Sequence, residues 1–136
     1  MPVITEFVQE MLAGDRSTST LGIELLSAAD GVAFASLTVA PSAANGHGIG
    51  HGGIVYALAD TAFACAANSV LPGTATADAS IVYLSPARVG EMLLAEARVR
   101  HRTSRQVFVD VTVRSGDRLV ADYRGRGVLL SVPRSG

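Results

Sequence analysis

The chain has 136 residues, 49% of them apolar and 17% charged, which suits one globular domain with a hydrophobic core. Its formal net charge is −1, so the composition gives no indication of nucleic-acid binding. Its single cysteine, Cys65, excludes a disulfide framework or a cysteine metal cluster, and we expect a small core residue there.

The N-terminal region lacks the basic start and long apolar stretch of a signal peptide, so we expect a cytoplasmic protein. Residues 3–13 have helical periodicity, and the predicted helix ends at Gly14. Its apolar face comprises Val3, Phe7, Val8, Met11 and Leu12. The polar residues 15–20 predict a loop, and two strands then flank Asp30-Gly31, a strong hairpin signal.

A glycine-rich stretch precedes the most apolar segment of the chain. Residues 45–53 contain five glycines and lead into a predicted helix from about Gly52 to Leu71. This helix is apolar on nearly all sides, so we expect it in the core. Its apolar run, 53–67, is too short to span a bilayer and contains Asp60, so no membrane partner is expected.

Four further segments alternate apolar and polar residues, which is typical of antiparallel strands with one buried face. They are residues 75–84, 91–102, 106–114 and 118–130. The sequence therefore predicts an α+β domain in which an antiparallel sheet of about six strands wraps around one buried helix. Such a sheet has edge strands, and pairing with a second chain is one way to cover them.

The segment Gly48–Gly53 matches G-x-G-x-x-G, and Asp78 follows 25 residues later, as in a dinucleotide fingerprint. We reject that function because a dinucleotide-binding fold needs buried parallel strands alternating with helices. The later strands are instead amphipathic and joined by short turns.

His47 and His51 are four residues apart, a spacing that suits a metal pair. No acidic residue or third histidine lies nearby, and His101 is on a distant predicted strand. We therefore favour hydrogen bonds within the loop and predict no metal.

Asp60 is the only charged residue between Gly53 and Ser69. One interpretation is a partly exposed helix carboxylate or an inter-subunit hydrogen-bond partner. The functional interpretation is a nucleophile or general base, because a carboxylate on an apolar helix needs a partner or a task.

An arginine group comprises Arg98, Arg100, Arg102 and Arg105, with Ser104. Its members lie along one strand and the following turn. They form either a solvated strand face or a phosphate clamp at the mouth of a site.

Several motifs resemble the hotdog-fold acyl-CoA thioesterases of the phenylacetate-pathway (PaaI-like) family. They are Asn45-Gly-His-Gly, His51-Gly-Gly, Leu58-Ala-Asp-Thr-Ala-Phe-Ala and Tyr83-Leu-Ser-Pro, within a resemblance over residues 20–130. The resemblance implies a curved antiparallel sheet around a central helix. We expect one domain over residues 1–136, with an N-terminal helix and loop in 1–20.

The resemblance also implies hydrolysis of an aryl- or acyl-CoA thioester to a free acid and CoA. Gly52 would donate its N–H to the thioester carbonyl, and Asp60 would be the nucleophile or the base that activates water. Asn45 would orient the water or the carboxylate, and His51 would shape the loop. CoA belongs to the substrate, so no separate cofactor is implied.

Substrate contacts are implied at Gly53, Thr61, Tyr83, Ser85, Arg102, Ser104 and Arg105. Two positions depart from the family pattern. Ser85 stands where many relatives have arginine, and Thr103-Ser104 replaces a glycine-containing turn.

Helix geometry constrains these roles. Gly52 and Asp60 are eight residues apart, which is about 12 Å along a helix, whereas attack needs reacting atoms about 3 Å apart. One helix therefore cannot easily supply both groups to one carbonyl. We expect a site shared by two subunits of a homodimer, and, as in the family, dimers paired into a homotetramer.

Two other functions remain open. An enoyl-CoA hydratase or dehydratase would need a catalytic histidine beside a carboxylate, which the spacing of His51 and Asp60 fits less well. A non-catalytic acyl-CoA-binding module is possible because fold does not determine function. A regulator usually carries an added DNA- or partner-binding segment. The N-terminal helix is too short and too acidic to bind DNA, which makes a regulator the less favoured function.

Overall fold

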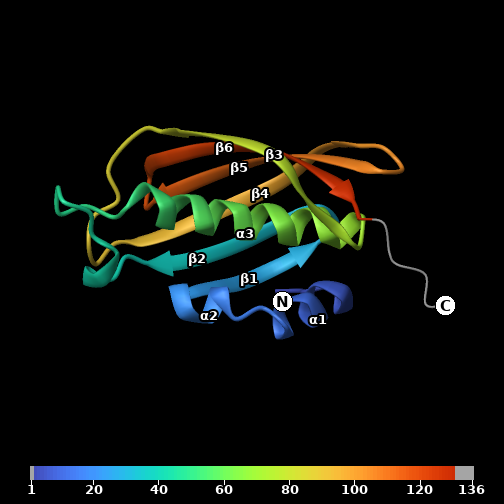
Figure 1. Cartoon of the computed structure of the whole chain (residues 1–136), viewed down its shortest axis with the longest axis horizontal. Coiled ribbons are helices and arrows are strands. Elements are labelled where there is room, and N and C mark those ends of the chain that lie inside the picture. Colours follow the sequence, from blue (N-terminus) through green and yellow to red (C-terminus); the bar gives the residue numbers. More distant parts are fainter. Residues whose placement is uncertain (1, 131–136) are drawn as a thin grey trace.

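Six antiparallel strands form one curved sheet, and helix α3 (Gly52–Val70) lies along its concave side (Figure 1). The computed structural model describes residues 2–130. The strands are β1 (Ile23–Ala29), β2 (Val32–Thr38), β3 (Thr74–Tyr83), β4 (Met92–Arg102), β5 (Gln106–Ser115) and β6 (Arg118–Leu129). Their order is β1-β2-β4-β5-β6-β3, so β1 and β3 form the edges. The fold class expected from the sequence is confirmed, and the architecture is the hotdog fold.

The core lies between α3 and the inward-facing side chains of the sheet. The period-two pattern of β5 buries Val107, Val109, Val111 and Val113. On β2 and β4, Ala33 pairs with Ala97 and Ala35 with Ala95, and all four are fully buried. These small side chains let the helix approach the sheet closely, while Leu58 and Phe63 of α3 fill the remaining space.

Helix α3 contacts all six strands, which explains why it is apolar on nearly every side. By length and composition alone, the 19 residues of α3 would suffice to cross a membrane, a test that a buried core helix also passes. The apolar run predicted from the sequence, 53–67, is shorter than the helix itself, which extends from Gly52 to Val70. In the fold, α3 is the core helix of the sheet.

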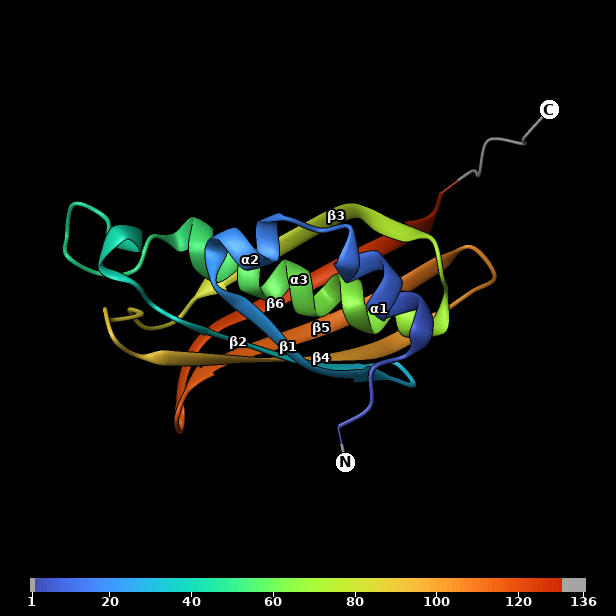
Figure 2. The same cartoon turned by 90° about the horizontal axis from the view of Figure 1, so that it is seen from below.

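The N-terminal segment differs from its prediction in two ways. Helix α1 (Glu6–Ala13) does not begin at residue 3, because Ile4 forms a parallel bridge with Ala28 of β1. A short helix, α2 (Ser17–Leu21), replaces the predicted loop. The Asp15 carboxylate organises its first turn by accepting hydrogen bonds from the backbone N–H groups of Ser17 (2.8 Å) and Thr18 (3.3 Å). Helix α1 packs on α3, and α2 packs on β1 (Figure 2).

Candidate active site

A cavity of about 360 Å³ opens at the N-terminal end of α3. It lies among the glycine-rich loop, the end of β3 and the segment that follows β3. Four of the residues that the sequence singled out line it, namely Asn45, Gly52, Tyr83 and Ser85. The rest of its lining is mostly apolar and comprises Ile49, Gly50, Val55, Leu84, Pro86, Ala87 and Val120.

Gly52 is the first residue of α3, and within residues 2–130 its backbone N–H has no hydrogen-bond partner. The next N–H, that of Gly53, is already used, because it donates to Nδ1 of His51 at 2.9 Å. His51 is therefore the N-cap of the helix, at the end of the glycine-rich loop. The positive end of the helix dipole and one free N–H thus lie at the cavity.

Tyr83 closes over the same glycine. Its hydroxyl donates to the Gly52 carbonyl oxygen at 2.8 Å, and a Cβ atom at position 52 would lie 3.1 Å from the end of the Tyr83 ring. Glycine at position 52 therefore allows this close contact.

Asn45 holds the glycine-rich loop in shape. Its Oδ1 accepts hydrogen bonds from the N–H groups of His47 (2.9 Å) and Ile49 (3.3 Å). Its Nδ2 group has no partner in the described part of the chain. The side chain can thus support the loop through its oxygen and donate to a ligand through its nitrogen.

Asp60 lies in the middle of α3 and is half-buried. Its Oδ1 accepts hydrogen bonds from the Tyr123 hydroxyl of β6 (2.7 Å) and the Thr76 hydroxyl of β3 (3.2 Å). The sequence singled out neither partner, since each belongs to an ordinary alternating strand. Both contacts arise from tertiary structure and join residues that are distant in the chain.

Asp60 does not line the cavity at Gly52. Because α3 is continuous between these residues, they are about 12 Å apart along the helix axis. Thr61, also expected at the site, uses its hydroxyl to donate to the Ala57 carbonyl oxygen within the helix at 2.8 Å.

The basic turn between β4 and β5 lies at the opposite end of the helix from the glycine-rich loop (Figure 1). The Arg102 guanidinium donates to the Val70 carbonyl oxygen and so stabilises the C-terminal end of α3. Ser104 and Arg105 belong to the same exposed turn. The structure therefore does not bring this turn to the Gly52 cavity of its own chain.

Arg98 and Arg100 lie on the outer face of the sheet. Arg98 pairs with Glu96 at 2.7 Å, and Arg100 pairs with Asp110 at 3.4 Å. For these two arginines, the structure favours the solvated strand face over a phosphate clamp.

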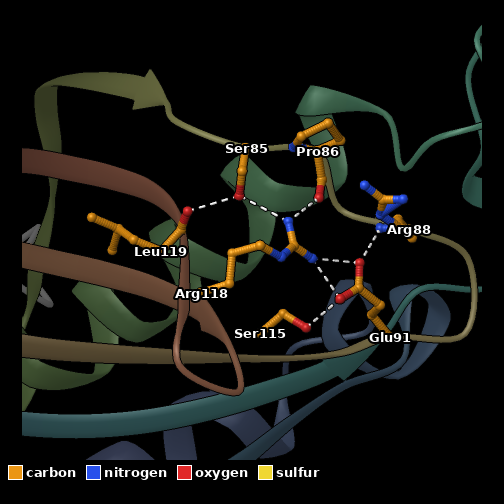
Figure 3. Close-up of polar contacts among 7 residues, drawn as sticks. All are labelled: Ser85, Pro86, Arg88, Glu91, Ser115, Arg118 and Leu119. Atoms are coloured by element: carbon orange, nitrogen blue, oxygen red, sulfur yellow. Dashed lines mark hydrogen bonds and ion pairs between the residues drawn. The ribbon is translucent and has the colours of Figure 1, made fainter.

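An ion-pair network holds one wall of the cavity (Figure 3). Arg118, at the start of β6, binds both carboxylate oxygens of Glu91 through Nη2 and donates to the Ser85 hydroxyl (2.8 Å) through Nη1. The Ser85 hydroxyl donates in turn to the Leu119 carbonyl oxygen at 2.7 Å. Ser85 therefore lines the cavity with its hydroxyl already committed to other parts of the protein.

The Glu91 carboxylate makes the stability of this wall dependent on pH. Hydrogen bonds from Ser115 and Arg118 lower the pKa of Glu91 from 4.5 to about 2. A lowered pKa in the folded state stabilises the protein above about pH 4.5, and this contribution is lost as the pH falls towards 2. Glu91→Gln should therefore lower the free energy of unfolding by about 1–3 kcal/mol at pH 7, and by less at pH 3.

Urea denaturation of both proteins at the two pH values measures this difference. Glu96→Gln is the matched control, because its ion pair with Arg98 is exposed and such pairs contribute about 0–1 kcal/mol. A gap between wild type and Glu91→Gln that is equal at both pH values would contradict the prediction.

Comparison with known proteins identifies the family to which this chain belongs. The family model described as the thioesterase superfamily matches residues 47–121. The chain is 36% identical over 117 residues to acyl-coenzyme A thioesterase PaaI of Escherichia coli, covering 85% of this chain and 84% of that protein. The structure of the E. coli PaaI protein superposes with a TM-score of 0.88, at 32% identity, and covers 93% of this chain and 92% of that one.

Two more distant relatives indicate the same family. Human acyl-coenzyme A thioesterase 13 is 30% identical over 128 residues, covering 89% of this chain and 90% of that protein. The Streptococcus mutans protein smu.793, solved bound to acetyl CoA, has a TM-score of 0.74 at 25% identity and covers 82% of this chain and 91% of that one. The chain therefore belongs to the thioesterase superfamily, and within it to the PaaI-like family of hotdog-fold acyl-CoA thioesterases.

Proposed function

We propose that this protein hydrolyses the thioester bond of an aryl- or acyl-CoA and releases the free acid and CoA. The observation that carries this proposal is the presence, on one helix, of a free N–H at Gly52 and a half-buried carboxylate at Asp60. Thioester hydrolysis needs both a donor for the developing oxyanion and a nucleophile or base. The names of the E. coli and human relatives, and the acetyl CoA bound to the S. mutans protein, support this substrate class.

Each group has a defined part in the proposed reaction. The Gly52 N–H donates to the thioester carbonyl oxygen as it becomes negative. Asp60 either attacks the carbonyl carbon or removes a proton from a water molecule that attacks it. In the first route, a mixed anhydride forms and CoA leaves as a thiolate that takes a proton; water then splits the anhydride. In the second, the tetrahedral intermediate expels the thiolate directly, and the Asn45 Nδ2 group orients the water.

The proposed site combines two subunits. About 12 Å separate Gly52 and Asp60 along α3, so one carbonyl cannot meet both groups of one chain. Asp60 is hydrogen-bonded to Thr76 of β3, an edge strand with no neighbour on its outer side in residues 2–130. The end of β3 and the residue after it expose Val82, Tyr83 and Leu84, each about half accessible.

A second copy docked along β3 would cover these apolar side chains and could bring its own Gly52 to Asp60. We therefore propose a homodimer as the smallest active unit, with two such dimers forming a homotetramer. At such a composite site, the CoA moiety would extend beyond the chain that supplies Gly52 and towards basic groups. The exposed Arg105 is our candidate for binding the CoA phosphates.

The proposal is tested by measuring thiol release from a panel of aryl- and straight-chain acyl-CoAs with the full-length protein. We expect catalytic turnover of at least one member. Tight binding of acyl-CoAs without thiol release from any of them would identify a non-catalytic binding module. Hydration of an enoyl-CoA without thiol release would identify a hydratase.

A further inference from the structure

Tyr123 places a buried hydroxyl against the carboxylate of Asp60. The residues are 63 positions apart in the chain, and their oxygens are 2.7 Å apart. This contact is shorter than that between Thr76 and the same oxygen, at 3.2 Å. Tyr123 is only 2% exposed, because it faces the core from a strand on which the neighbouring residues Asp122 and Arg124 face solvent.

The Tyr123 ring is held on several sides. It makes an edge-to-face contact with Tyr56, with ring centroids 5.4 Å apart, and a tilted contact with Phe63 at 5.8 Å. Gly125 leaves room for this packing, because a Cβ atom there would lie 2.8 Å from the Phe63 ring and 3.0 Å from the Tyr123 ring. A ring packed in this way cannot easily turn its hydroxyl away from Asp60.

The hydroxyl also stays protonated. Burial, followed by the hydrogen bond to Asp60, raises the pKa of Tyr123 well above its ordinary value. Tyr123 therefore remains a hydrogen-bond donor at every pH at which the folded protein is expected to work.

The two oxygens of Asp60 consequently have different surroundings. Oδ1 accepts two hydrogen bonds, whereas Oδ2 has no partner among residues 2–130. Oδ2 is also not fully enclosed by the protein, because within residues 2–130 the Thr5 hydroxyl is the only fully enclosed side-chain polar atom that lacks a hydrogen-bond partner. One oxygen is thus anchored, and the other is open to a ligand or water.

We propose that Tyr123 is a positioning residue for Asp60: its hydroxyl fixes Oδ1 so that Oδ2 faces the thioester or the attacking water. This inference rests on the proposed thioesterase function of Asp60. A carboxylate held within a narrow range of orientations reacts faster, because small misplacements of a reacting group reduce the rate strongly.

Tyr123→Phe is the test, since phenylalanine keeps the ring and its contacts with Tyr56 and Phe63. We expect kcat for thiol release to fall about 10- to 100-fold while KM changes less than about threefold. In an Asp60→Asn background, the same substitution should leave the residual rate unchanged, because it acts only through the carboxylate. An equal proportional loss in both backgrounds would overturn the proposal and indicate a general structural effect.

Thr74→Val is the matched control. Thr74 is also buried, and its hydroxyl donates to the Leu71 carbonyl oxygen at the far end of α3. Both variants lose one buried hydroxyl hydrogen bond, so both should lower the Tm by a few degrees. Only Tyr123→Phe should lower kcat.

The two hypotheses fail in distinguishable ways. If Asp60→Asn abolishes turnover but Tyr123→Phe has wild-type kcat, the positioning role of Tyr123 is wrong and the function stands. If Asp60→Asn has wild-type kcat, the proposed role of Asp60 is wrong, and the inference about Tyr123 falls with it.

Discussion

Asp60→Asn is expected to lower kcat for thioester hydrolysis about 10²–10⁴-fold, with a much smaller change in KM. Asparagine has nearly the same shape, and its carbonyl oxygen can still accept the hydrogen bonds from Tyr123 and Thr76. It has no negative charge, however, so it can neither attack the carbonyl carbon nor take a proton from water. Steady-state thiol release from the best acyl-CoA of the panel measures the loss.

Asp78→Asn is the control for this substitution. Asp78 lies on β3 near Thr76, but it is exposed and pairs with Arg126 at 2.8 Å on the outer face of the sheet. Removing that carboxylate should leave kcat close to the wild-type value. Wild-type turnover by Asp60→Asn, or an equal loss in the two variants, would refute the role of Asp60.

Gly52→Pro is expected to reduce kcat/KM about 10²–10³-fold relative to Gly52→Ala. Proline lacks the N–H that we assign to the oxyanion, and it is well tolerated at the first position of a helix. His51 before it has φ −59° and ψ 137°, which suits a residue that precedes proline. The comparison is matched because both variants place a Cβ about 3.1 Å from the Tyr83 ring, and alanine keeps the N–H.

Thiol-release kinetics on both variants, with circular dichroism to confirm an intact fold, provide the measurement. Equal activity of the proline and alanine variants would show that the Gly52 N–H is not the essential donor. The donor would then have to come from another group at the cavity.

Gly52→Pro also tests whether the active site is shared by two subunits. Mixed with Asp60→Asn under conditions of subunit exchange, Gly52→Pro should restore activity to about a quarter of the wild-type level. About half of the dimers would then be mixed, each with one intact site of two. No recovery after exchange has been confirmed by mass spectrometry would rule out a site composed of Gly52 from one chain and Asp60 from the other.

Residues near one another in sequence proved the most predictable parts of the site. The glycine-rich loop and the start of α3 depend on local hydrogen bonds, and sequence spacing is informative about those. The structure adds that His51 is the N-cap of α3. The short helix α2 was missed because its polar residues have no apolar periodicity. The Asp15 side chain stabilises that helix instead.

Arginine side chains were the least predictable. Arg118 looked like any charged residue on a strand, yet it joins Glu91 and Ser85 at the wall of the cavity. Arg102 is among the residues predicted to contact the substrate, and its guanidinium donates to the Val70 carbonyl oxygen at the C-terminal end of α3. A long side chain can reach several partners, and the three-dimensional arrangement alone decides which of them it meets.

By itself, the sequence determined the type and order of the core elements, helix α3 and the six strands, because side-chain periodicity differs between a buried helix and a half-buried strand. It also determined the glycine-rich loop and the lone carboxylate of α3, and from helix geometry the separation of Gly52 from Asp60. Only the tertiary structure decided that β6 lies beside β3, which brings Tyr123 and Thr76 to the same oxygen of Asp60. The physical reason is that strand order and ring packing depend on how the whole core fills its space, and no local pattern encodes that arrangement.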